Sequence, residues 1–171
     1  MPMHKNHPPA LSDADRTPQS RLSEGPVHGI VGYQLAQASI VTDQVFDERV
    51  GQADDGGLRR VEFTILALVQ ANPGVSARSL ARALAVTPPN IAIWIDKLES
   101  RGLVERERSE RDGRVQHIRL SRAGATRVQQ CTQRLLEGEQ AALSTLSVAE
   151  RAMLVELLHK LALARRRSEA G

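Results

Sequence analysis

Residues 106–121 (RERSERDGRVQHIRLS) hold the side chains whose types and spacing most clearly suggest chemistry. Arginines recur through the segment with acidic side chains between them, on both sides of the pair Asp112-Gly113. A guanidinium group donates paired hydrogen bonds to carboxylates and phosphates. Two interpretations follow: a surface loop of solvated ion pairs, or a set of cations that meet an anionic partner.

The distribution of charge favours an anionic partner. The chain of 171 residues has a formal net charge of only +3, but its charges are unevenly placed. Residues 1–57 carry four basic and eight acidic side chains, whereas residues 76–122 carry ten basic and six acidic ones. This asymmetry indicates that the middle of the chain meets the anionic partner.

Composition indicates one helical domain with a tail or an interaction element. Apolar residues make up 41% of the chain and aromatic residues only 2%, so Leu, Ile, Val and Ala must build the core. The single cysteine, Cys131, excludes a disulfide framework within one chain and fits a reducing compartment. Because no segment has the apolar length of a secretory signal or a membrane span, we expect a soluble, cytoplasmic protein with no membrane partner.

Sequence motifs assemble neither a catalytic centre nor a metal site. The chain has no glycine-rich phosphate loop, no nucleophile elbow and no supported pair of carboxylates. Its five histidines lack metal-ligand spacing. We therefore expect no enzymatic activity, no cofactor and no structural zinc. For Cys131, which lies on an apolar stripe, a buried inert thiol is favoured over a redox sensor.

The elements that position the basic segment begin after a proline-rich stretch. The first 26 residues hold five of the eight prolines and few large apolar side chains, so residues 1–27 are predicted to be a disordered arm. Apolar residues then recur every three or four positions over residues 28–50, which predicts an amphipathic helix about 35 Å long. Residues 51–57 form a loop after it.

Three further helices are predicted before the basic segment. The first covers residues 58–71 and ends at Asn-Pro-Gly. Ser76 caps a short second helix, and Thr87 caps the third, with Pro88 at its first position and Gly102 as its left-handed end. The side chains predicted to face inward from the second and third helices are Leu80, Ala81, Leu84, Ile91, Trp94, Ile95 and Leu98.

The basic segment itself is predicted to be a β-hairpin. Its strands are residues 103–108 and 115–120, joined by residues 109–113 with their Asp-Gly turn. Ser121 then begins a long helix, and Ser-Val-Ala-Glu at residues 147–150 is a capping box that begins a last, apolar helix. On one stripe of the long helix we expect Val128, Cys131, Leu135 and Ala142. The hairpin thus follows directly after a helix–turn–helix.

The run SARSLARALAVTPPNIAIWIDKLESRGLVERERSERDGRVQHIRLSRAG resembles the MarR (multiple antibiotic resistance regulator) family. The resemblance implies a mainly α fold with a small two-stranded β-wing, in which N- and C-terminal dimerisation helices flank a winged helix–turn–helix. The motifs that carry it are Leu80-Ala81 with Leu84, Asp96-Lys97-Leu98, Gly102-Leu103-Val104, Asp112-Gly113-Arg114, and Leu120-Ser121 with Gly124.

The resemblance also implies the organisation and partners of the chain. After the arm of residues 1–27 come an N-terminal dimerisation helix and loop (28–57), a DNA-binding winged helix–turn–helix (58–122) and C-terminal dimerisation helices (123–171). A homodimer would bind a pseudo-palindromic site on double-stranded DNA and release it on binding a small, often aromatic, acid. The long first helix and apolar last helices independently favour the dimer, because one small domain could hardly cover their apolar stripes.

A helix–turn–helix presents its second helix to the major groove, so the outward residues of that helix are the predicted base readers. Asn90 fits adenine and Ile93 fits a thymine methyl group, with helix capping and packing on a neighbour as the alternatives. The outward set is Pro89, Asn90, Ile93 and Lys97. Predicted phosphate contacts are Arg78, Arg82, Lys97 and Arg101.

Arg114 follows the turn of the predicted wing. An arginine inserted into a narrow minor groove reads its shape and negative potential. By resemblance, Asp112 braces the wing and orients that arginine, and Arg111 is a further candidate for DNA contact. The alternative is a solvated patch of ion pairs, each worth less than about 1 kcal/mol.

By resemblance, a ligand pocket lies between the first, second and long fifth helices. His28, Tyr33, Arg59 and Arg60 are the candidates for holding an aromatic carboxylate there, with core packing and surface pairing as the alternative. The predicted function is a sequence-specific transcriptional regulator, a repressor relieved by such an acid. The competing function is a winged helix used only for protein–protein assembly, which the apolar recognition helix favours and which salt-dependent DNA binding would distinguish.

Overall fold

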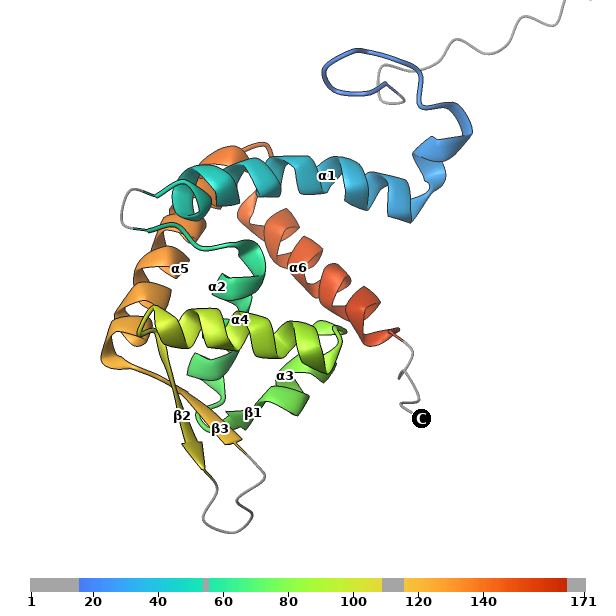
Figure 1. Ribbon diagram of the computed structural model, residues 1–171. Helices are drawn as coiled ribbons and strands as arrows, with labels where there is room; N and C mark the ends of the chain where they lie inside the picture. The colour runs from blue at the N-terminus through green and yellow to red at the C-terminus, as the bar shows by residue number, and fades with distance from the viewer. Residues whose placement is uncertain (1–15, 54–55, 109–115, 166–171) are drawn as a thin grey trace, which may run out of the picture. The chain divides into compact units, whose positions relative to one another are not determined.

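The computed structural model describes residues 16–53, 56–108 and 116–165. They divide into two compact units at the step from Asp43 to Gln44. Helices predominate, with one small antiparallel sheet (Figure 1). Among the described residues, none of the helices combines the length and the apolar character needed to cross a membrane.

The N-terminal unit leads into helix α1 (Val31–Phe46). A bridge between Arg16 and Ser23 and a 3-10 helix at Gly25–Gly29 precede it, so residues 16–27 of the predicted arm have a defined conformation. The helix begins three residues later than residue 28, because Ile30 has an extended backbone that separates the two helices. At its far end a π-helical turn, Asp47–Gly51, replaces the predicted last α-turn. The α-helical part is therefore about 24 Å long rather than 35 Å.

In the second unit, α2 (Arg60–Ala71), α3 (Ala77–Leu84) and α4 (Pro88–Ser100) form the predicted helix–turn–helix region. Ser76 caps α3 by accepting a hydrogen bond from the amide of Ser79 at 3.2 Å, as predicted. Thr87 occupies the N-cap position of α4, but its side chain makes no capping hydrogen bond. The predicted cap is therefore present in position but not in hydrogen bonding.

The end of α4 follows the sequence prediction. Gly102 has a left-handed backbone with φ of +66°, and the amide of Leu103 donates to the carbonyl of Leu98 at 2.9 Å. This is the hydrogen bond of a glycine-terminated helix. The chain therefore turns directly from α4 into the first wing strand.

The sheet has three strands rather than the predicted two. Strands β2 (Val104–Arg108) and β3 (Gln116–Leu120) pair in antiparallel register, with Val104 opposite Leu120. Strand β1 (Val75–Ser76) pairs with the other edge of β3, giving the order β1-β3-β2. Two residues are too few to show strand alternation in the sequence. Through β1 the wing is joined to the start of α3.

The chain ends in α5 (Arg122–Ala142) and α6 (Val148–Leu163), which Ser121 and Ser147 cap as predicted. Val128 and Cys131 of α5 are buried, whereas Ala142 is exposed, contrary to its predicted place on the apolar stripe. The core of the second unit joins α2, α3, α4, β2, β3 and α5. Its most buried side chains include Ile65, Leu66, Leu80, Ile91, Ile95, Leu98, Ile118, Val128 and Cys131.

Candidate nucleic-acid interface

Helix α4 has one buried and one exposed face. Ile91 and Ile95 are each 1% exposed, and Leu98 is fully buried. On the other face Ile93 is 62% exposed, so it does not pack on a neighbour within this chain. Pro89 and Asn90 are also exposed, and Thr87 rather than Asn90 holds the N-cap position. Pro89, Asn90 and Ile93, which were predicted to contact bases, are therefore all accessible on α4.

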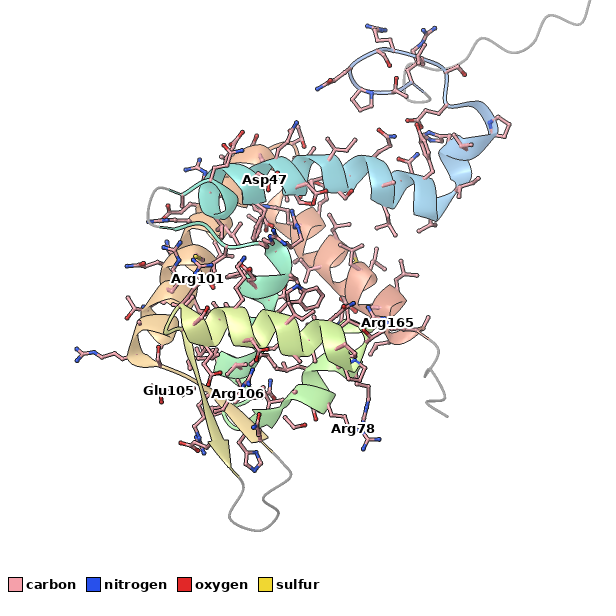
Figure 2. The ribbon with its side chains drawn as sticks, viewed as in Figure 1. Asp47, Arg78, Arg101, Glu105, Arg106 and Arg165 are labelled. Atoms are coloured by element: carbon pink, nitrogen blue, oxygen red, sulfur yellow. The ribbon has the colours of Figure 1, made fainter. Side chains whose placement is uncertain are left out.

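Helix α3 adds exposed cations to this region. Arg78 and Arg82 are both exposed and lie one helical turn apart. Figure 2 shows Arg78 pointing away from the helix. Their position fits the predicted phosphate contacts, which need accessible guanidinium groups on the element preceding the recognition helix.

The wing strands project together away from the helices of their unit (Figure 1). Arg111, Asp112 and Arg114, the predicted wing residues, lie outside the described residues. Within the strands, Arg119 Nε lies 2.7 Å from Glu107 Oε2, and both side chains are about half exposed. Of the two interpretations of residues 106–121, Arg119 therefore fits the solvated ion pair.

Arg106 joins the wing to the recognition helix. Its guanidinium group pairs with Asp96 and lies 3.5 Å from Glu99, both on α4. The sequence analysis did not assign this role. The signal was present, since Asp96 and Glu99 are three residues apart on one helix face and a strand containing Arg106 follows shortly after the helix.

Lys97 and Arg101 have partners that the sequence analysis did not anticipate. Lys97 Nζ lies 2.5 Å from Oε1 of Glu62, and Arg101 Nη1 lies 3.4 Å from Oε2 of the same carboxylate. Arg101 also donates to the carbonyl oxygens of Gly56 and Gly57. Both predicted phosphate contacts are therefore directed at the protein itself.

Glu62 is 1% exposed and belongs to the first turn of α2. Its carboxylate also accepts a hydrogen bond from the amide of Arg59 at 3.0 Å, which begins the helix at residue 60 rather than 58. Burial alone would raise the pKa of Glu62. The hydrogen bonds from Lys97 and the Arg59 amide, with the charges of Lys97 and Arg101, outweigh burial and lower this pKa below its ordinary value.

The predicted ligand residues fall into two pairs, which the structure describes separately. His28 and Tyr33 lie in the N-terminal unit, where His28 Nδ1 is 2.7 Å from Glu24 Oε2 and the Tyr33 hydroxyl donates to Oε1 at 3.2 Å. Gln34 donates to the same carboxylate at 3.2 Å. The hydrogen bond from His28, aided by those of Gln34 and Tyr33, lowers the pKa of Glu24. Desolvation raises the pKa of Tyr33.

Arg59 and Arg60 line a cavity of about 490 Å³ in the second unit. The guanidinium carbon of Arg60 lies 4.6 Å from the ring centroid of Phe46, within the range of a cation–π contact. Other residues around the cavity are Phe46, Asp47, Leu58, Glu62 and Lys97. The lining therefore combines an aromatic ring with three cationic side chains and two carboxylates.

Comparison with known proteins agrees with this architecture. The MarR family model matches residues 58–115, from the start of α2 into the wing. This match covers about a third of the chain and lies in its predicted DNA-binding region. Transcriptional regulators are among the proteins that resemble the chain.

Several known proteins are similar to this chain. It is 28% identical over 153 residues to a putative transcriptional regulatory protein for the hcr operon of Thauera aromatica, covering 90% of this chain and 88% of that protein. The transcriptional repressor CouR, solved bound to a 23-mer DNA duplex, is 28% identical with a TM-score of 0.74, covering 84% of this chain and 99% of that one. The PcaV regulator of Streptomyces coelicolor shares the fold at 21% identity and a TM-score of 0.69, covering 81% and 95%.

Proposed function

We propose that this chain is a transcriptional regulator of the MarR type that binds a pseudo-palindromic operator in double-stranded DNA as a homodimer. Each copy places α4 in the major groove and its wing against the adjacent minor groove. The observation that carries the proposal is the accessible face of Pro89, Asn90 and Ile93, held by a buried opposite face. CouR, solved on DNA at 28% identity, supports it.

The individual contacts follow from side-chain chemistry. Asn90 donates and accepts at an adenine edge, and Ile93 packs on a thymine methyl group. Arg78 and Arg82 contact phosphates. In the wing, the resemblance assigns Arg114 to the minor groove and Asp112 to orienting it, with Arg111 as a further candidate for DNA contact. Lys97 and Arg101 are left out of this surface because Glu62 holds them.

Exposed apolar side chains on α6 support the homodimer. In the single chain Met153 is 55% exposed, Leu157 is 53% exposed and Leu161 is 47% exposed. An apolar helix that is exposed along its length marks a protein–protein interface. A second copy of the same chain, covering the same face symmetrically, removes this apolar surface from water.

The proposed effector is a small aromatic acid that binds the cavity beside Arg59 and Arg60 and relieves repression. The volume of about 490 Å³ is in the range of small-molecule sites. Benzoate as a probe, with benzyl alcohol as its uncharged control, tests this directly. Benzoate should weaken DNA binding in wild type and lose that effect in Arg60→Gln. Equal effects of benzoate and benzyl alcohol would contradict the proposed carboxylate site.

The DNA-binding proposal itself is tested with duplexes selected by the protein from a random pool. The selected sites should contain inverted half-sites, and fluorescence anisotropy should show affinity that falls steeply with salt. The competing function, a winged helix for protein–protein assembly, is favoured by the high exposure of Ile93. Failure to enrich any sequence, together with salt-independent affinity, would favour that alternative.

A further inference from the structure

Glu62 is a buried carboxylate that connects two helices. It is 1% exposed in the first turn of α2, and its two oxygens face Lys97 in the last turn of α4 and Arg101 at the C-cap of that helix. Lys97 Nζ lies 2.5 Å from one oxygen. One acidic side chain of α2 therefore holds two cations of the recognition helix.

Both cations extend the proposed DNA-facing edge of α4. Ile93, Lys97 and Arg101 follow one another at intervals of four residues, which places them along one face of the helix. The side chain of Lys97 is 46% exposed and that of Arg101 is 28% exposed. On such an edge, long cationic side chains would contact phosphates of any DNA sequence, because phosphate contacts carry no base information.

We propose that Glu62 is a positioning residue that sets the DNA specificity of this protein. It holds Lys97 and Arg101 against the body of the protein and withholds two cations from the DNA backbone. Moving either cation to a phosphate would leave a buried carboxylate with fewer partners, which is strongly unfavourable. Affinity then depends more on the base contacts of Asn90 and Ile93 than on charge. This inference rests on the proposed DNA-binding function.

Glu62→Gln tests the inference, because glutamine keeps the shape and loses the charge. The released Lys97 and Arg101 should reach phosphates, and the salt slope of log affinity for a random duplex should steepen by about 0.9 for each cation. For the four cations of the proposed homodimer, the loss of affinity between about 50 and about 200 mM salt grows about a hundredfold. A purely structural loss would lower stability without steepening this slope.

Glu137→Gln, on α5, is the matched control. Glu137 is exposed and its carboxylate accepts a hydrogen bond from Gln133. Its substitution makes the same change of net charge as Glu62→Gln without releasing Lys97 or Arg101, so its salt slope should equal that of wild type. Restoration of the wild-type slope in the triple variant Glu62→Gln, Lys97→Gln, Arg101→Gln would assign the steepening to the two cations.

Lys97→Gln gives an independent result that does not depend on how Glu62→Gln folds. Because Lys97 is held by Glu62, this variant should keep the wild-type salt slope on random DNA. A shallower slope would mean that Lys97 already contacts phosphate and would overturn the inference, as would an unchanged slope in folded Glu62→Gln. Absence of salt-dependent DNA binding by the wild type would instead overturn the proposed function itself.

Discussion

Among single residues, Gly124 shows most directly why a position in this fold requires glycine. A Cβ built on Gly124 would lie 1.9 Å from the carbonyl oxygen of Leu103, so the start of α5 can approach the start of the wing only without a side chain. The same glycine belongs to the family motif at Leu120-Ser121 with Gly124. The sequence motif thus has a physical cause in backbone packing between α5 and the wing.

Gly124→Ala should therefore destabilise the protein by about 1–3 kcal/mol, the usual cost of overpacking a tight contact. Thermal unfolding followed by circular dichroism measures the loss. Gly32→Ala is the matched control, since nothing lies within 4 Å of a Cβ at that position of α1. An unchanged melting temperature for Gly124→Ala would show that the backbone at Leu103 moves aside freely.

The ion pairs of Glu62 also predict a pH dependence. Its pKa is lowered in the folded protein, so ionised Glu62 contributes stability above the unfolded-state pKa of about 4.3, and that contribution is lost as the pH falls through the folded-state pKa. Relative to Glu62→Gln, the stability advantage of the wild type should begin to shrink as the pH falls below about 4.3. Urea unfolding of the wild type and of Glu62→Gln at pH 7 and at pH 3.5 measures this advantage. An equal difference in unfolding free energy between the two proteins at both pH values would contradict the role of the Glu62 ion pairs.

Among helices and strands, the features that depend on residues close together in the sequence were predicted, whereas those that depend on distant residues were not. The caps of α3, α5 and α6 at Ser76, Ser121 and Ser147 were predictable because a cap and its amide partner are three residues apart in sequence. Strand β1 was not predictable, because its existence depends on pairing with β3 more than 40 residues away. The same holds for the pairing of Glu62 with Lys97, at a separation of 35 residues.

For the wing, we predict that one ion-pairing arginine holds its strands against α4. Arg106 pairs with Asp96 and Glu99, so it joins β2 to α4. Arg106→Gln should lower stability by less than about 1 kcal/mol, as for exposed ion pairs, yet reduce hydrogen-exchange protection in β2 and β3. Arg119→Gln, which breaks only the cross-strand pair with Glu107, is the control and should keep that protection. Equal protection in both variants would mean that Arg106 does not hold the wing.

For the whole molecule, the proposed assembly depends on the apolar helix α6. Many residues of this helix are apolar, yet their side chains are exposed in the single chain. Leu157 and Leu161, for example, are each about half exposed. Periodicity predicted that this helix is apolar, and its apolar stripe favoured a dimer, but the exposure of its side chains in a single chain could be seen only in the structure. That exposure depends on how much core α2 to α5 already complete without α6.

Leu157→Glu together with Leu161→Glu should abolish the homodimer, because charges at an apolar interface lose their hydration without gaining partners. Multi-angle light scattering should report a dimer for the wild type and monomers or aggregates for the variant. A wild-type mass equal to one 171-residue chain would contradict the proposed dimer.

Sequence reading by the exposed face of α4 is the central claim, and Asn90→Ala tests it most directly. Anisotropy titrations should compare wild type and variant on a duplex selected by the wild type and on a random duplex. The account predicts a loss of about 1–3 kcal/mol of binding free energy on the selected duplex and almost none on the random one. Equal affinities of wild type and Asn90→Ala on the selected duplex would contradict it.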